Sequence, residues 1–169
     1  VLIHTGRFID QKNQSFVLDI FKDVKRKHAE AKLILLGTGN LLSEVEHKAE
    51  KLEIKSDVFF LGVRENVQDY LSAADCYVMP SLYEGLPVAA VEAECSGLPC
   101  VLSSNITKEV ALTSSIKFLS LNQPIEIWTN EVLKSRNSKR TDNSKVVADN
   151  GYDVQTVAKW LETFYLEKR

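Results

Sequence analysis

Residues 76–97 read CYVMPSLYEGLPVAAVEAECSG, and this stretch decides the fold. Its opening run, CYVM, is apolar and favours a buried strand that Pro80 ends. Pro87 suits the first position of a helix, which we expect to run to about Cys95 and to stop at Gly97. The stretch therefore predicts a strand, a polar loop and a helix, which is the repeating unit of a parallel sheet.

The same alternation extends over the rest of the chain. Further apolar runs predict strands at residues 1–5, 32–36, 58–61, 100–103 and 116–119. Apolar residues at helical spacing predict helices at residues 13–29, 41–52, 67–74, 125–133 and 154–166. Asn66 is expected to cap the helix that follows it. Strands that alternate with helices specify an α/β fold with a mostly parallel sheet, and uninterrupted apolar strands indicate a three-layer sandwich with helices on both faces.

The chain divides into three segments. Its 169 residues fit one domain, to which we assign residues 1–136. Residues 137–149 are expected to form a polar surface linker, because apolar residues nearly vanish there, and residues 150–169 a C-terminal helix. Val1 is not a Met and opens directly into a strand, so we expect the sequence to be a fragment that another segment precedes.

The composition is that of a globular protein and excludes several functions. A net charge of −2 gives no general attraction to nucleic acid or anionic lipid, and no run approaches the ~20 apolar residues that span a bilayer. The basic residues of the linker leave open a peripheral contact of the full-length protein with the inner face of a membrane, although a solvated loop is the preferred interpretation. Cys76, Cys95 and Cys100 form no CxxC pair, which favours free thiols and a cytoplasmic location.

Two basic residues follow the first predicted strand. Ligands of open α/β sheets bind outside the carboxyl ends of the strands, so the loop that contains Arg7 and Lys12 is a candidate binding site. The paired donors of an Arg and the point charge of a Lys could together neutralise a diphosphate. The alternative is that both are solvated surface charges.

Two glutamates flank the start of the helix at Pro87. Gly85 precedes that start, where free backbone N–H groups and the helix dipole favour an anion. Glu92 stands among apolar residues and is expected to be buried, where an ionised carboxylate needs hydrogen-bond donors such as paired sugar hydroxyls. The alternatives are that Glu84 caps the helix and that Glu92 forms a salt bridge.

Taken in order, these motifs resemble a known family. They are GRF at 6–8, QKN at 11–13, LGTG at 36–39, FLG at 60–62, AD at 74–75, PSLYEGLP at 80–87, EA at 92–93 and GLP at 97–99. Together they resemble the C-terminal domain of the GT-B glycosyltransferases of family 4, the glycosyl transferases group 1, over residues 1 to about 133. The spacing from Glu84 to Glu92 matches the E-x7-E motif of that family. Residues 106–110 and the QKN variant are most similar to bacterial exopolysaccharide and capsule enzymes.

The resemblance implies a Rossmann-like domain that binds the nucleoside diphosphate sugar, preferably a UDP-sugar, of a retaining glycosyltransferase. Arg7 and Lys12 would bind the diphosphate and stabilise the leaving nucleotide, and Glu84 would lie beside the donor sugar. Glu92 would accept hydrogen bonds from the ribose hydroxyls. Asn13, where many relatives have Gly, could still cap the helix that follows. The residues expected to contact the donor are Gly6, Gly37, Gly39, Val63, Arg64, Glu84, Gly85, Leu86, Pro87 and Glu92.

The resemblance also implies which partners the chain needs. The sequence has no DxD motif and its three histidines are scattered, so we expect neither a metal nor another cofactor, with Arg7 and Lys12 in the role of the metal. The acceptor, a saccharide or a lipid-linked sugar, would bind to an N-terminal domain that is missing here. In family members the final helix crosses back onto that domain. We therefore expect the chain alone to be inactive.

Two other functions stay open. A sugar-nucleotide epimerase of the GT-B fold would share the donor site. A non-catalytic regulatory module of flavodoxin-like fold would instead need an acidic cluster and a phosphorylatable Asp at the strand ends, where this sequence has Arg, Lys and Glu.

Overall fold

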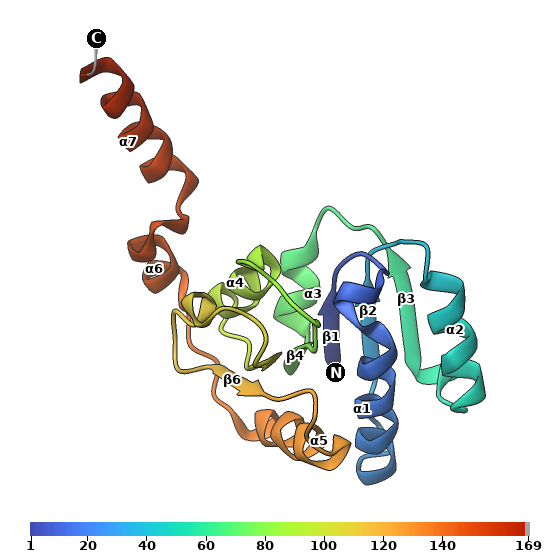
Figure 1. Cartoon of the computed structure of the whole chain (residues 1–169). Coiled ribbons are helices and arrows are strands. Elements are labelled where there is room, and N and C mark those ends of the chain that lie inside the picture. Colours follow the sequence, from blue (N-terminus) through green and yellow to red (C-terminus); the bar gives the residue numbers. More distant parts are fainter. Residues whose placement is uncertain (168–169) are drawn as a thin grey trace.

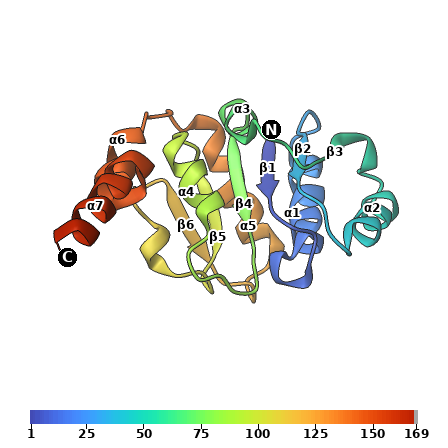
Figure 2. The same ribbon diagram turned by 90° about the horizontal axis from the view of Figure 1, so that it is seen from above.

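The computed structural model of the chain describes residues 1–167 and is built around one parallel sheet of six strands. Figure 2 shows the strands in the order β3-β2-β1-β4-β5-β6, and each neighbouring pair runs parallel. The predicted α/β fold is therefore confirmed, with a sheet that is parallel throughout. The strands are β1 (Leu2–Thr5), β2 (Leu33–Leu36), β3 (Val58–Gly62), β4 (Cys76–Met79), β5 (Cys100–Ser103) and β6 (Ile116–Leu119).

Helices cover both faces of this sheet. They are α1 (Gln14–Lys27), α2 (Leu42–Lys51), α3 (Val67–Ala73), α4 (Val88–Cys95), α5 (Ile125–Lys134) and α6 (Ser144–Val147), and the remaining helix, α7 (Val154–Glu167), does not pack on the sheet. One core lies between the sheet and α1, α2 and α5 and includes Val17 and Trp128. The other lies between the sheet and α3, α4 and α6 and includes Leu71, Val91 and Val147. The sheet is thus the middle one of three layers (Figure 1).

The strand order creates a switch point between β1 and β4. From β1 the chain moves outward to β2 and β3, crosses back to β4, and then moves outward in the other direction to β5 and β6. The loops that follow β1 and β4, residues 6–13 and 80–87, therefore begin at neighbouring strands on the carboxyl edge of the sheet. In open α/β sheets this is where ligands bind.

Two predicted helix starts need correction. Pro87 has an extended conformation as the N-cap of α4, so the helix begins at Val88. Asn66 occupies the N-cap position of α3, but its side chain donates to Asp69 Oδ2 at 2.8 Å and makes no capping bond to the backbone. The Asp69 carboxylate, and not the backbone N–H groups of the first turn, is thus the partner of the Asn66 side chain.

The polar segment 137–149 is anchored on the domain. Arg140 donates to two carbonyl oxygens at the end of α3, and Asn143 donates from Nδ2 to the carbonyl of Glu94 at 2.9 Å. Both Asn143 and Val147 are buried. The expectation of a solvated loop is therefore wrong for Asn143 and Val147, because long-range hydrogen bonds and one apolar side chain hold the segment against α3 and α4, whereas Arg140 is anchored but exposed.

Helix α7 projects away from the domain, beyond α6 (Figures 1 and 2). The predicted helix at residues 154–166 is confirmed, whereas residues 168 and 169 of the predicted segment 150–169 lie outside the described residues. None of the described residues of α7 is buried, and its apolar side chains include Val154 at 78% exposure and Trp160 at 61%. This helix exposes an apolar surface that the rest of the described chain does not cover.

Candidate functional site

The loops after β1 and β4 are joined by hydrogen bonds at the switch point. The backbone N–H of Leu82 donates to the carbonyl of Gln11 at 2.8 Å. Gln11 Nε2 donates to the carbonyl of Tyr83 at 3.0 Å, and Asn13 Nδ2 donates to the carbonyl of Pro80 at 3.1 Å. Two segments about seventy residues apart in sequence thus form a single polar surface.

Asn13 owes its place to an unusual backbone conformation. Its φ of +54° lies in the left-handed region, which glycine adopts freely and asparagine tolerates better than most residues. Its side chain reaches across to Pro80 and makes no capping hydrogen bond to α1. The prediction that Asn13 caps the following helix through its side chain is wrong, and its observed role is to hold the two loops together.

An ion pair forms the centre of this surface. Lys12 Nζ donates to Glu84 Oε1 at 2.6 Å, with 18% of the Lys12 side chain and 9% of the Glu84 side chain exposed. The Lys12 side chain runs over Gly6, where an added Cβ would lie 3.3 Å from Lys12 Cδ. Both residues were predicted site residues, and the structure brings them into direct contact.

Arg7 lies in the same loop as Lys12 and is exposed. Its carbonyl accepts a hydrogen bond from Gln14 Nε2 at 2.8 Å, which fixes the backbone. Among residues 1–167, no hydrogen bond or ion pair holds its guanidinium. The Arg7 side chain is thus a second cation that can reach an anion beside Lys12.

Gly37 and Gly39 allow a third loop to approach these two. An added Cβ at Gly37 would lie 2.1 Å from the carbonyl oxygen of Gly6, and one at Gly39 would lie 2.4 Å from that of Phe8. The backbone N–H of Phe8 donates to the carbonyl of Thr38 at 2.9 Å. These glycines therefore hold the loop after β2 against the loop of Arg7, since a side chain at either position would collide with backbone.

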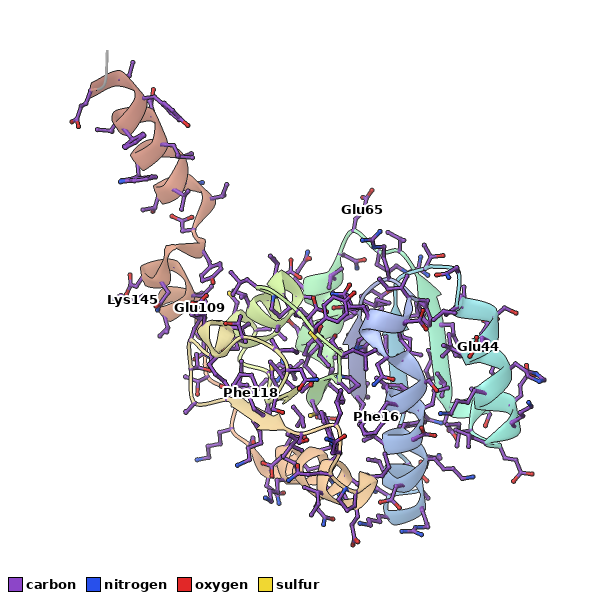
Figure 3. The ribbon with its side chains drawn as sticks, in the orientation of Figure 1. Phe16, Glu44, Glu65, Glu109, Phe118 and Lys145 are labelled. Carbon is purple, nitrogen blue, oxygen red and sulfur yellow. The ribbon has the colours of Figure 1, made fainter. Side chains whose placement is uncertain are left out.

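Helix α4 points its first turn at the same edge. Gly85 and Leu86 are exposed in front of it, and the unpaired N–H groups of a first helical turn favour an anion. Val63 and Arg64 are exposed in the loop between β3 and α3, from which Glu65 also projects away from the domain (Figure 3). These predicted residues share the carboxyl edge, and no hydrogen bond in the described chain joins them to the Lys12 and Glu84 pair.

Glu92 is exposed, which corrects the expectation that it is buried. With Glu65 and Gln68 it lines a hollow of about 250 Å³ between α3 and α4. The neighbouring atoms still exclude enough water to raise the pKa of the Glu92 carboxyl. Burial also raises the pKa of the Tyr77 hydroxyl, to which the charges of Glu92 and Glu84 contribute, so both carboxylates lie within electrostatic reach of one buried group.

The buried carboxylate of α4 is Glu94, two residues further along. It is fully buried and accepts hydrogen bonds from the backbone N–H groups of Leu112 and Thr113, at 3.1 and 2.9 Å. Burial raises the pKa of the Glu94 carboxyl, against the lowering effect of these bonds. Helical spacing carries the signal that distinguishes it from Glu92, since the buried Ala90 and Val91 lie four and three positions before Glu94.

His4 lies in β1, beneath this site. It is fully buried, and its Nδ1 lies 2.9 Å from the carbonyl of Val78, while its Nε2 has no partner within residues 1–167. Burial lowers the pKa of His4 to about 4. His4 therefore carries no charge at neutral pH, and the two cations above it face no imidazolium.

Three further features concern metals, thiols and membranes. Within residues 1–167, the side chains of His, Cys, Asp and Glu form no group of three or more that could hold a metal ion. Cys76, Cys95 and Cys100 are free thiols, and Cys76 and Cys100 are buried. No helix in this part of the chain has the length and apolar character that crossing a membrane requires.

Comparison with known proteins identifies related sequences. The sequence model of the family described as Glycosyl transferases group 1 matches residues 1–112. The chain is 38% identical over 159 residues to the putative glycosyltransferase EpsF of Bacillus subtilis (strain 168), covering 92% of the chain and 41% of the relative. It is 26% identical over 172 residues to the capsular polysaccharide biosynthesis glycosyltransferase CapH of Staphylococcus aureus, covering 98% and 47%.

A solved structure has the same fold. The Anabaena protein Alr3699/HepE, in complex with UDP and glucose, superposes with a TM-score of 0.81 at 17% identity. The match covers 97% of this chain and 47% of that one. The chain spans less than half the length of each of these three proteins.

Proposed function

The chain belongs to the glycosyl transferases group 1 family, and we propose that it is the donor-binding half of an enzyme that moves a sugar from a nucleoside diphosphate sugar to a saccharide or lipid-linked acceptor. The predicted fold, a Rossmann-like half of the GT-B architecture, is confirmed. The observation that carries the proposal is the Lys12 and Glu84 pair at the switch point of the sheet, with Arg7 in the same loop. Bound UDP in the Anabaena neighbour supports UDP as the nucleotide.

The diphosphate would bind between the cations and the start of α4. Arg7 and Lys12 supply two positive charges: the guanidinium has no partner within residues 1–167, and the ammonium is paired with the Glu84 carboxylate. The first turn of α4 adds backbone donors and the positive end of its dipole. These charges would bind the diphosphate without a divalent metal.

The rest of the donor would extend along the same edge. Glu84 would contact the sugar, because its carboxylate is adjacent to the proposed diphosphate position. Glu92 would accept hydrogen bonds from the ribose hydroxyls at the mouth of the hollow between α3 and α4. Val63 and Arg64 would lie along the base, and Gly6, Gly37 and Gly39 would shape the floor.

The charges explain how the site would promote transfer. The bond between the anomeric carbon and the diphosphate oxygen breaks, its electron pair stays on the diphosphate, and a new bond forms from the acceptor oxygen, whose proton is released. Negative charge grows on the departing oxygen, where Arg7, Lys12 and the α4 terminus would stabilise it. We propose transfer with retention of anomeric configuration, as the family resemblance implies.

A second domain would complete the enzyme. We propose that the acceptor binds to a domain corresponding to the rest of the longer relatives, across a cleft that excludes water from the donor sugar. The exposed apolar face of α7 supports such a partner surface, since Trp160 and Leu161 are 61% and 40% exposed. The free thiols fit a reducing compartment, so we place the enzyme in the cytoplasm, with a peripheral contact of the full-length protein at the inner face of the membrane left as a proposal.

The test is calorimetric titration of the 169-residue chain with UDP, GDP, ADP and TDP, each with and without EDTA. We expect UDP to bind most tightly and its affinity to be unaffected by EDTA. Absence of binding by all four nucleotides would refute the donor site, and loss of binding with EDTA would refute the metal-free part. The chain alone should transfer no sugar, whereas a full-length protein should do so.

The two other functions predict different results. The carboxyl edge carries the ion pair of Lys12 and Glu84, with Arg7 in the same loop as Lys12, whereas a flavodoxin-like regulatory module would need an acidic cluster there. An epimerase would share the donor site described here. Assays of the full-length protein distinguish the two enzymes: a transferase moves the sugar to an acceptor, whereas an epimerase inverts a centre of the nucleotide sugar.

A further inference from the structure

The Glu84 carboxylate is held by two consecutive residues of one turn. Lys12 Nζ donates to Oε1 at 2.6 Å, and Gln11 Nε2 donates to Oε2 at 3.3 Å. Both donors come from the single 3-10 turn Asp10–Lys12 in the loop after β1. One oxygen is therefore bound by a cation and the other by a neutral amide.

Binding of a nucleotide would offer Lys12 a second and stronger anion. A diphosphate carries more negative charge than a carboxylate, and Lys12 is one of the two cations in this loop that can reach it. If Lys12 turns to the diphosphate, Oε1 loses its partner on a side chain that is only 9% exposed. A carboxylate so enclosed needs another donor if it is to keep its place.

Gln11 would keep one donor on the other oxygen of the carboxylate, because Lys12 plays no part in holding Gln11. An amide nitrogen has two hydrogens, and here one is donated to the Tyr83 carbonyl at 3.0 Å and the other to Glu84. The carbonyl of Gln11 also accepts the N–H of Leu82 at 2.8 Å. The backbone and the side chain of Gln11 together fix this residue to the loop after β4, which carries Glu84.

We propose that Gln11 is a positioning residue for Glu84, which keeps the carboxylate directed at the donor sugar after Lys12 has moved to the diphosphate. The inference rests on the proposed function, in which Glu84 contacts the sugar and Lys12 the diphosphate. With Gln11 in place, Glu84 can bind the sugar and Lys12 can bind the diphosphate, although the two side chains are paired in the unbound protein. Its amide supports sugar binding and leaves the binding of the nucleotide to Lys12.

Asn105, which follows β5, provides a matched control on the same loop. Its Nδ2 donates to the carbonyl of Leu82 at 2.9 Å, so it braces the same loop as Gln11. It makes no hydrogen bond to the Glu84 carboxylate within the described chain. Loss of Asn105 therefore loosens the loop without removing a donor from the carboxylate.

The experiment measures the dissociation constants of UDP and of a UDP-sugar for the 169-residue chain by calorimetry. The UDP-sugar is whichever of UDP-glucose, UDP-galactose and UDP-N-acetylglucosamine the wild type binds most tightly. We expect Gln11→Ala to weaken UDP-sugar binding about 10-fold and UDP binding by less than about 2-fold, as for the loss of one hydrogen bond to a charged group. Gln11→Glu, which replaces the donor by a like charge, should weaken UDP-sugar binding further. Asn105→Ala should change both ligands by the same factor.

A Glu84→Gln variant separates the two ways in which the account can fail. If Glu84→Gln weakens UDP-sugar binding while Gln11→Ala does not, the positioning role of Gln11 is overturned and the proposed function stands. If Glu84→Gln leaves the ratio of the two dissociation constants unchanged, Glu84 does not contact the sugar, and the proposed role of Glu84 falls together with this inference. If Gln11→Ala weakens UDP and UDP-sugar binding by the same factor, Gln11 only supports the loop, as Asn105 does, and its positioning role is also overturned.

Discussion

Two regions on either side of α4 hold a glutamate in opposite ways. At the switch point, Glu84 is bound by the side chains of Lys12 and Gln11. Both residues lie in the loop after β1, and the long side chain of Lys12 is partly exposed to solvent. On the inner side of α4, Glu94 is fully buried and bound by the backbone N–H groups of residues 112 and 113. The first region can exchange its partners for a ligand, whereas the second cannot.

This difference indicates how the protein divides binding from stability. Partners on long side chains can turn to a new anion with little change of fold, as we propose for Lys12. Backbone donors are fixed by the fold, so the Glu94 carboxylate that they bind connects α4 to the segment before β6. Substitutions in the first region should thus alter affinity, and substitutions in the second should alter the free energy of unfolding.

The largest effect is expected for Glu94→Ala. The change leaves two backbone N–H groups without their acceptor and empties a buried volume, so the free energy of unfolding should fall by roughly 3–4 kcal/mol. Urea denaturation measures it. Glu84→Ala is the matched comparison and should cost less than Glu94→Ala, because the Lys12 ammonium that it leaves unpaired sits on a long stem and can turn toward solvent. Equal losses in the two variants would contradict the division between the regions.

His4 should give a stability that depends on pH. Burial lowers the folded pKa of His4 from 6.5 to about 4, so between these values the unfolded chain binds the extra proton. This contribution is complete above pH 6.5 and is lost as the pH falls toward 4, by about 3 kcal/mol in total. Urea denaturation of wild type and His4→Gln at several pH values measures it. A stability difference between them that stays constant from pH 7 to pH 4 would exclude a buried neutral imidazole.

The cations should act on phosphate alone. Lys12→Ala and Arg7→Ala should each weaken UDP binding by about 2 kcal/mol and leave uridine binding nearly unchanged, because a charge-assisted hydrogen bond is lost only to the diphosphate. Calorimetry with both ligands provides the comparison. Lys12→Arg is the control that retains the charge and should recover part of the loss. Similar losses for UDP and uridine would place these residues elsewhere than at the phosphates.

Glu92 should affect both ligands by the smallest amount. Glu92→Ala should weaken UDP and uridine alike by about 1–2 kcal/mol, because both carry the ribose hydroxyls. Its exposed side chain makes a change in unfolding free energy of more than about 0.5 kcal/mol unexpected. Uridine binding that survives Glu92→Ala in a folded protein would show that the ribose lies elsewhere.

Much of the fold could be predicted because local patterns and tertiary structure agree. Most strands were marked by an apolar run, as at residues 76–79, and β1, β4 and β5 are buried at every position. The polar segment 137–149 misled the prediction, since its composition is that of a loop. Arg140 and Asn143 are anchored to carbonyls far away in the sequence, and no local pattern marks such bonds.

The site was predictable only in its main residues. Ligands of open α/β sheets bind outside the carboxyl ends of the strands, which selected the loops of Lys12 and Glu84. The family resemblance assigned the roles of these residues. Gln11 was missed because its partner lies across the switch point, beyond the reach of sequence spacing. Glu92 was wrongly expected to be buried because both glutamates of α4 have apolar neighbours, although helical spacing places Glu94 on the inner face.

A crystal structure of the 169-residue chain with UDP would show whether Lys12 exchanges Glu84 for the diphosphate. We expect the diphosphate within hydrogen-bond distance of Lys12 Nζ and the Arg7 guanidinium, and the ribose hydroxyls on the Glu92 carboxylate. We also expect that Lys12 Nζ has left Glu84 Oε1 while Gln11 Nε2 still contacts Oε2. A nucleotide bound away from the carboxyl edge of β1 and β4, or a diphosphate that leaves the Lys12 and Glu84 pair closed, would contradict these expectations.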